Sequence, residues 1–284
     1  MKTLIISDIH HGVNRADCII DEAKADRTIF LGDFFDMFDD TPADAARTAQ
    51  WIRARIENHP EDVFLMGNHD VPYRWVMVPE FCCPGWTNAK WRATESILTP
   101  KHWNQFKLHH WEPGPTPDSN PWLFSHAGIC EWIFRPGYST DNYIDKNPPW
   151  TIPRSRIDEL CATAIEHARS RIPELVLSAV GHACGGQCQK GGIVWQRWYE
   201  FDPTPGINQI VGHTPSRRVQ HRTRMLEERM LEDKIFVQQE DANGEFVSDN
   251  YCLDTVLNHY GILENGEVSF YNAPLPPTLI KINK

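Results

Sequence analysis

Five short motifs in this chain each supply a side chain that could bind a metal ion. In chain order they are Asp8-Ile9-His10, Gly32-Asp33, Gly67-Asn68-His69-Asp70, Ser125-His126-Ala127-Gly128 and Gly212-His213-Thr214. Carboxylate, amide and imidazole groups can together hold two divalent ions roughly 3.5–4 Å apart, with a bridging water that can attack phosphorus. The motifs therefore predict a two-metal hydrolytic site.

A short apolar run precedes each motif and is predicted to form a β-strand. These runs cover residues 3–6, 28–31, 63–66, 122–124 and 207–211. In an open α/β sheet, side chains that follow the carboxyl ends of the strands meet at one edge, where such sheets bind their ligands. One Asp-x-His or Gly-Asp pair occurs by chance in many chains. Five motifs in this arrangement favour one shared site.

Helices are predicted between the first strands, so strands and helices alternate along the chain, as in an α/β fold. Asn14 can cap a helix that runs to about residue 24, and Thr41 can cap a second helix with Pro42 at its first position. A third helix is predicted for about residues 153–171, where apolar residues recur at helical spacing. The βαβ order should bring the ends of the first three strands side by side.

The motifs resemble those of the calcineurin-like metallophosphoesterases, and within that superfamily the phosphoprotein-phosphatase branch, which includes small bacterial and phage members and the dinucleoside-tetraphosphate hydrolases. Two further stretches carry the closer resemblance: Gly192-Ile193-Val194-Trp195-Gln196-Arg197, and Cys252-Leu253-Asp254-Thr255 followed by Gly261-Ile262-Leu263. The likeness covers residues 1–70, about 122–130, 192–215 and 250–271. It implies the calcineurin-like α/β fold, a two-layer β-sandwich flanked by helices.

The resemblance also implies which residues bind metal. Asp8 and His10 are two apart, so on a strand they would share a face and hold one ion, and Asp33 would bridge to the second. The complete ligand set is Asp8, His10, Asp33, Asn68, His126 and His213. Mixed oxygen and imidazole ligands suit Mn, Fe or Zn better than Ca, so two divalent ions are expected as cofactors, with manganese favoured.

His69 and Asp36 match the family's proton donor and the carboxylate that orients it. Imidazole suits this task because its ordinary pKa of about 6.5 lets it hold or release a proton near neutrality. Arg197, in the Trp-x-Arg segment, matches a phosphate clamp, since a guanidinium offers two parallel donors to phosphate oxygens. The alternative for Arg197 is a solvated surface arginine.

Three departures from the family pattern bear on the substrate. Met37 stands where phosphoprotein phosphatases carry an arginine, and His11 displaces the glycine that would follow His10. Pro215 stands where phosphodiesterase relatives carry the second histidine of Gly-His-x-His. The first departure weakens the assignment to protein phosphatases, and the last weakens the assignment to nucleases.

Size and composition favour one domain. The predicted ligands run from Asp8 to His213 and must converge, so 284 residues are predicted to form a single domain, 1–284, with insertions at about 72–121 and 131–190. The net charge of -10 disfavours nucleic acid as a partner, because polyanion binding needs many basic contacts.

No signal peptide or membrane-spanning run is found, so a cytoplasmic location is expected, with no membrane partner. The oligomeric state stays open.

The tryptophan-rich segment and the cysteines can each be interpreted in two ways. Seven of the eleven tryptophans lie between Trp75 and Trp132, and the favoured interpretation is an insertion that buries its own aromatic rings; the other is a cap that lines the substrate entrance. The eight cysteines are expected to be free thiols. Half of a zinc site at His182, Cys184 and Cys188 is the disfavoured alternative, because no second half lies nearby.

We interpret the sequence as a metal-dependent phosphoesterase that hydrolyses phosphomonoesters of a phosphoprotein, a nucleotide or a small molecule. The resemblance implies direct attack by a metal-bridging hydroxide. One alternative is a phosphodiesterase that acts on nucleotides or nucleic acid. An alternative of another class is a scaffold that binds metal without catalysis, which the presence of His69 and Asp36 disfavours.

Overall fold

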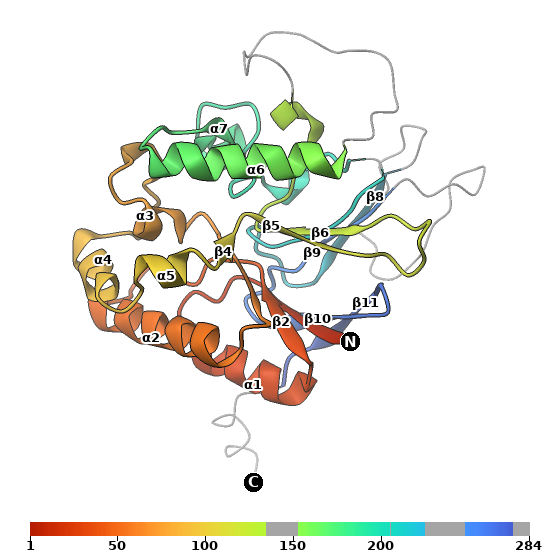
Figure 1. Cartoon of the computed structure of the whole chain (residues 1–284), viewed down its shortest axis with the longest axis horizontal. Coiled ribbons are helices and arrows are strands. Elements are labelled where there is room, and N and C mark those ends of the chain that lie inside the picture. Colours follow the sequence, from red (N-terminus) through yellow and green to blue (C-terminus); the bar gives the residue numbers. More distant parts are fainter. Residues whose placement is uncertain (135–152, 205, 225–247, 275–284) are drawn as a thin grey trace.

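Two β-sheets lie face to face at the centre of this computed structural model, and helices cover them on both sides (Figure 1). The structure describes residues 1–134, 153–204, 206–224 and 248–274. The expected α/β sandwich is therefore confirmed.

The first sheet has six strands in the order β11-β10-β1-β2-β3-β4. The strands β1 to β4 run parallel, and β10 is antiparallel to β1, with Ile5 opposite Ile29 on β2 and Gly261 on β10. Their bounds are β1 Lys2–Ile6, β2 Arg27–Phe30, β3 Val63–Leu65, β4 Phe106–Lys107, β10 His259–Glu264 and β11 Glu267–Asn272.

The second sheet has five strands in the order β5-β6-β7-β9-β8. The strands β6, β7 and β9 are parallel, while β5 and β8 run antiparallel at the two edges. Their bounds are β5 His109–Glu112, β6 Trp122–Ser125, β7 Asn208–Val211, β8 Gln220–Arg224 and β9 Ser248–Cys252. All five strands predicted from the motifs are present.

Apolar side chains from both sheets form the layer between them. Ile5, Ile29 and Leu65 of the first sheet lie in one buried cluster with Phe124 and Ile210 of the second. Strands buried on both faces read as continuous apolar runs, which is why each motif follows such a run. This layer fixes the two sets of strand ends relative to each other.

Helices α1 (Val13–Ala23) and α2 (Pro42–Asn58) lie along one side of the molecule, and α6 (Arg154–Arg169) and α7 (Leu175–Ser178) lie along the opposite side (Figure 1). Thr41 and Asp44 form the capping box that starts α2. The remaining helices are α3 Val71–Arg74, α4 Asn88–Glu95 and α5 Pro100–Trp103, and the 3₁₀ turns are Pro79–Phe81, Glu131–Phe134, His182–Cys184 and Trp198–Glu200.

The start of the first helix differs from the prediction. Helix α1 begins at Val13 after Gly12, with no side-chain cap, so Asn14 lies inside its first turn. The motif explains the difference, because the turn that carries Asp8 and His10 ends directly at Gly12. No helix in the described ranges combines the length and the apolar character of a membrane span.

The tryptophan-rich segment buries its rings, as the favoured interpretation expected. Trp75 and Trp103 are buried in the core, while Trp86, Trp91 and Trp111 are partly buried against it. Strands β4 and β5 also come from this segment and join the two sheets. The division of the chain into one domain with two insertions stays a prediction, and residues 135–152 of the second insertion lie outside the described residues.

Candidate metal centre

The motifs sit in tight turns just beyond the strand ends. Strand β1 ends at Ile6, so Asp8 and His10 do not share the face of a strand as expected; they lie in a turn where their φ angles are 47° and 40°. Asp33, after β2, has a φ of 53°. Positive φ is costly for residues other than glycine and is retained where the surroundings enforce it. The turns therefore aim these side chains at the cost of backbone strain.

Two glycines let the neighbouring turns approach each other. Gly32 has a φ of +102°, and a Cβ there would lie 2.5 Å from the Gly67 nitrogen. A Cβ on Gly67 would collide with the Asp33 side chain. The Gly-Asp and Gly-Asn pairs thus reflect a close approach of the loops after β2 and β3. Asp70 holds this approach together, since its carboxylate accepts N–H groups from Asp33, Phe34 and Gly67.

Six of the predicted site residues converge, and Asp33 is at the centre. Asp8, His10 and Asp33 offer ligand atoms within 4.8 Å of one another, and so do Asp33, His126 and His213. These two groups share only Asp33. The amide oxygen of Asn68 lies 3.0 Å from His126 Nε2 and 2.9 Å from His213 Nδ1, which places it in the second group.

The imidazole rings present lone pairs to this centre. His126 Nδ1 donates to the Leu31 carbonyl at 2.9 Å, and His10 Nδ1 donates to the Asp36 carbonyl at 2.6 Å. Each ring therefore turns Nε2 toward Asp33 Oδ2, at 3.3 Å from His126 and 3.6 Å from His10. A neutral imidazole whose other nitrogen donates to a carbonyl is the usual form of a metal-binding histidine.

Acceptors thus face acceptors at the centre, which is the observation that tests whether a metal fits. The oxygens of Asp33 and Asn68 and the Nε2 atom of a neutral His126 carry no hydrogen, and His213 Nδ1 joins them as an acceptor in the tautomer that has its hydrogen on Nε2. Turning the Asn68 amide over would let its nitrogen donate to Val194 O at 3.2 Å and to His213 Nδ1, but it would remove the oxygen from the centre. With the oxygen inward, the donor set fits a divalent ion.

Burial and charge act on the protonation of these groups. Burial, with the charges of Asp254 and Asp33, raises the pKa of Asp8 well above its ordinary value. Burial alone would raise the pKa of Asp33, but the charges of His126 and His69 hold it far below its ordinary value. Burial and the charge of His126 lower the pKa of His213, which favours the neutral ligand form.

His69 and Asp36 lie beside this centre and contact each other. His69 Nδ1 is 3.3 Å from Asp36 Oδ2, and its ring is 5.1 Å from the ring of His10. Burial lowers the pKa of His69, but the charge of Asp33 and the hydrogen bond to Asp36 outweigh it and raise the pKa to about 11.

Arg197 lies at the edge of the centre next to His213. Its Nη1 donates to the His213 carbonyl at 3.2 Å, and its Nε donates to Cys184 Sγ at 3.1 Å. Cys184 in turn lies 3.9 Å from His213 Nε2. Arg197 is therefore partly buried beside a predicted ligand, which differs from the solvated surface arginine that was its alternative.

Cysteines 184 and 188 do not assemble a zinc site in the described part of the chain. Neither ligand group there includes a cysteine, and the His182 ring faces the Gln187 carbonyl at 3.2 Å. The cysteines within these ranges are free thiols.

The three residues that depart from the family pattern lie in different environments. His11 is buried, with its ring nitrogens 2.7 Å from Thr48 Oγ1 and 2.7 Å from Asp40 Oδ2. Met37 is 56% exposed, and as a methionine it offers no cationic group to a phosphate. Pro215 is exposed just after the turn that carries His213.

Three polar residues around the centre and its neighbour Asp36 had no predicted role. Lys90 and Tyr73 both donate to Asp36, and they come from the segment 72–121, which carries none of the five motifs. Asp254 is buried and its charge contributes to the raised pKa of Asp8. The Cys-Leu-Asp-Thr stretch was a signal for Asp254, whereas the sequence carried no signal for Lys90.

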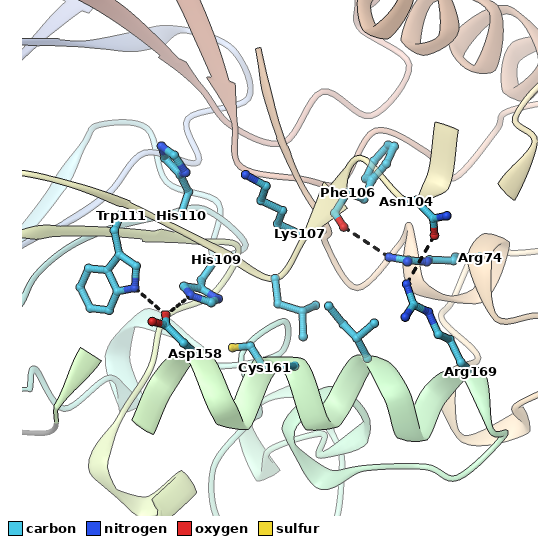
Figure 2. A pocket seen from close by; sticks show the side chains of 13 residues that line it. Arg74, Asn104, Phe106, Lys107, His109, His110, Trp111, Asp158, Cys161 and Arg169 are labelled. Atoms are coloured by element: carbon cyan, nitrogen blue, oxygen red, sulfur yellow. Dashed lines mark hydrogen bonds and ion pairs between the residues drawn. The ribbon is translucent and has the colours of Figure 1, made fainter. Parts of the chain in front are cut away.

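A separate cavity of about 520 Å³ lies between α6 and strands β4 and β5, and Figure 2 shows its walls. Arg74, Arg169 and Asn104 stand at one end; at the other, Asp158 accepts from His109 at 2.7 Å and from Trp111 at 2.9 Å. None of the predicted site residues lines this cavity. The candidate metal centre is thus defined by the strand-end turns rather than by this cavity.

A family model and several solved structures are similar to this chain. A family model described as calcineurin-like phosphoesterase matches residues 1–238. The solved structure of a cold-active protein-tyrosine phosphatase from a psychrophilic Shewanella species is similar, with 14% identity over 96% of this chain and 80% of that chain, at a TM-score of 0.52. A metallophosphoesterase from Sphaerobacter thermophilus matches with 16% identity over 96% and 89% of the two chains, at a TM-score of 0.41. No curated protein matches the sequence.

Proposed function

We propose that this chain, which belongs to the calcineurin-like phosphoesterase family and is a metallophosphoesterase, hydrolyses phosphomonoesters by direct attack of water on phosphorus. The observation that carries the proposal is the pair of ligand groups that share Asp33, with the His69–Asp36 pair beside them. The substrate class we propose is a phosphoprotein, a nucleotide or a small phosphomonoester. Placement in the phosphoprotein-phosphatase branch rests on Trp195-Gln196-Arg197 and the Cys252–Thr255 stretch.

Asp8, His10, Asp33, Asn68, His126 and His213 would hold two divalent ions, manganese in our proposal and iron or zinc as alternatives. When bound, such ions lower the pKa of water and stabilise charge that develops on phosphoryl oxygens. Asp33 would be shared because its carboxylate belongs to both groups. A cytoplasmic location forms part of the same proposal.

His69 is proposed as the proton donor to the leaving oxygen. Its Nδ1 faces Asp36, which leaves Nε2 as the nitrogen that can reach a substrate. The proton that His69 holds is what a leaving alkoxide needs, because an alkoxide is too basic to depart without protonation. Asp36 fixes the ring orientation, as a second carboxylate does for many catalytic histidines.

Cys83 is the rival nucleophile, since its Sγ lies 3.4 Å from His69 Nδ1. A Cys–His pair can attack phosphorus and form a phosphoenzyme. However, Cys83 is only 2% exposed, and burial raises the pKa of its thiol. A buried thiol of raised pKa is a poor nucleophile, so water is the nucleophile we propose.

Arg197 is proposed to bind the phosphoryl group. Its Nε and Nη1 are occupied by Cys184 and His213, and no hydrogen bond to Nη2 is found among the described residues. Held in this way, the guanidinium can direct Nη2 to a non-bridging oxygen. A monoester dianion offers more charge to this donor than a diester monoanion does.

A comparison of monoester and diester substrates tests this proposal. We expect wild-type kcat/KM to be higher for nitrophenyl phosphate than for the bis ester, and Arg197→Ala to lower monoester turnover far more than diester turnover, because the arginine meets the extra anionic oxygen. A matched control is Arg156→Ala, because the Arg156 side chain is 60% exposed on α6. Preference for the bis ester, or an equal effect on both substrates, would favour the phosphodiesterase alternative. Absence of turnover with either would favour the scaffold.

A further inference from the structure

We propose that Lys90 is a positioning residue for the proton donor, because it fixes the carboxylate that orients His69. The inference rests on the proposed role of His69 and extends it to the segment 72–121, which carries none of the five motifs. Lys90 touches neither the ligand groups nor His69 directly; it acts through Asp36.

The contacts form a continuous buried chain. Lys90 Nζ donates to Asp36 Oδ1 at 2.8 Å and to Asp40 Oδ1 at 2.7 Å. Tyr73 Oη donates to the same oxygen of Asp36 at 2.7 Å, which leaves Asp36 Oδ2 to face His69. Oδ1 is thus occupied by two donors, and the rotation of the carboxylate is fixed. This division of the two oxygens aims Oδ2 at the His69 ring.

The position of Lys90 costs free energy in two ways. Lys90 is 3% exposed although its charge favours water. It is also the third residue of α4, after the capping residue Thr87, where the positive end of the helix dipole disfavours a cation. Residues that break local preferences in this way are concentrated at functional sites.

Two buried carboxylates offset this cost. The side chains of Asp36 and Asp40 are 1% and 6% exposed. Burial alone would lower the pKa of Lys90, but hydrogen bonds to Asp36 and Asp40 raise it, so the lysine stays charged. Without Lys90, Asp36 and Asp40 would repel each other with no cation between them.

The tryptophan-rich segment that carries Lys90 also packs directly against Asp36. Gly85 has a φ of +94°, and a Cβ there would lie 3.1 Å from the Asp36 Cβ. Helix α4 packs against α2, and the second carboxylate, Asp40, also contacts His11, which bonds Thr48 of α2. The tryptophan-rich segment therefore contributes the frame that holds Asp36, in addition to burying its own rings.

The test uses the leaving-group dependence of Lys90→Met. We expect kcat for an alkyl phosphate to fall about 10- to 100-fold, part of the roughly 10²–10⁴-fold that a general acid supplies. The loss for nitrophenyl phosphate should be much smaller, because nitrophenolate departs without protonation. Two divalent ions should remain bound, and Lys90→Arg should restore part of the activity, since it keeps the charge. Lys101→Met, an exposed lysine on α5, is the matched control.

The double variant Lys90→Met/His69→Asn separates positioning from general damage. If Lys90 acts through His69, adding Lys90→Met to His69→Asn should change alkyl phosphate turnover less than twofold. A further loss in that background, or equal losses for both leaving groups, would overturn the inference. If Lys90→Met does not fold, the double variant Lys90→Met/Asp40→Asn is used instead, because it removes the repulsion between the Asp36 and Asp40 carboxylates. Its kinetics are compared with those of Asp40→Asn alone. Should His69→Asn itself show no leaving-group dependence, the proposed role of His69 fails instead.

Discussion

Replacement of Asp33 by Asn is expected to release metal from both positions of the centre. Asp33 is the only residue shared by the two groups of potential ligands in the described chain, and an amide carries no charge to offset two divalent ions. The loss of affinity should exceed the roughly 10–100-fold that follows removal of a residue behind the ligands. Phosphatase activity should fall with it. Elemental analysis after equilibrium dialysis against manganese measures the number of ions per chain.

The control for this experiment is Asp158→Asn in the cavity of Figure 2, where the carboxylate bonds His109 and Trp111 away from the predicted ligands. That variant should keep two ions. If Asp33→Asn also keeps two ions at full affinity, Asp33 does not bridge them. If it loses only one, Asp33 belongs to a single metal position.

Replacement of His69 by Asn is expected to slow the hydrolysis of alkyl phosphates while metals stay bound. The loss in kcat should be roughly 10²–10⁴-fold, the usual contribution of a general acid. His69 Nδ1 faces Asp36 Oδ2 at 3.3 Å, which leaves Nε2 as the nitrogen that can deliver a proton to the alkoxide. Nitrophenyl phosphate should be affected far less.

His59→Asn is the matched control, because that ring is 44% exposed at the end of α2. Its kinetics should equal those of the wild type for both leaving groups. A Brønsted plot over a series of leaving groups measures the effect, and its slope should become steeper in His69→Asn. An unchanged slope would remove His69 from the role of proton donor.

The sequence predicted the sheet framework and the convergence of the ligands well, for a physical reason. Strands buried on both faces must be continuous apolar runs, and polar residues that follow them must lie at the sheet edge. Hence the turns after β1, β2, β3, β6 and β7 bring together five of the predicted ligands, and the Asn68 amide oxygen lies beside His126 and His213. The glycines of the motifs were explained only by the close approach of Gly32 to Gly67.

Predictions from local sequence preferences were wrong at two places next to the site. Asp8 and His10 were expected on one face of a strand, but the chain leaves β1 at Ile6 and takes positive φ angles that no propensity predicts. Asn14 is a good capping residue, yet the turn before it sets the start of α1 at Val13. In both cases the geometry of the site prevails over local preference.

The contributions of the tryptophan-rich segment were not visible in the sequence. Its periodicity is irregular, and no motif marks Lys90 or Tyr73 as partners of Asp36. Contacts between residues about 37 and 54 positions apart in the chain depend on how α4 packs against α2. Such tertiary contacts follow from the complete fold, since neither composition nor spacing specifies them.

The stereochemical course at phosphorus tests the central claim most directly. A phosphorothioate monoester made chiral at phosphorus with one oxygen isotope is hydrolysed in water that carries another, and the configuration of the released thiophosphate is determined. Direct attack by water is a single in-line displacement and predicts inversion. Retention would require two displacements, and so a phosphoenzyme on a side chain such as Cys83, and would contradict the account.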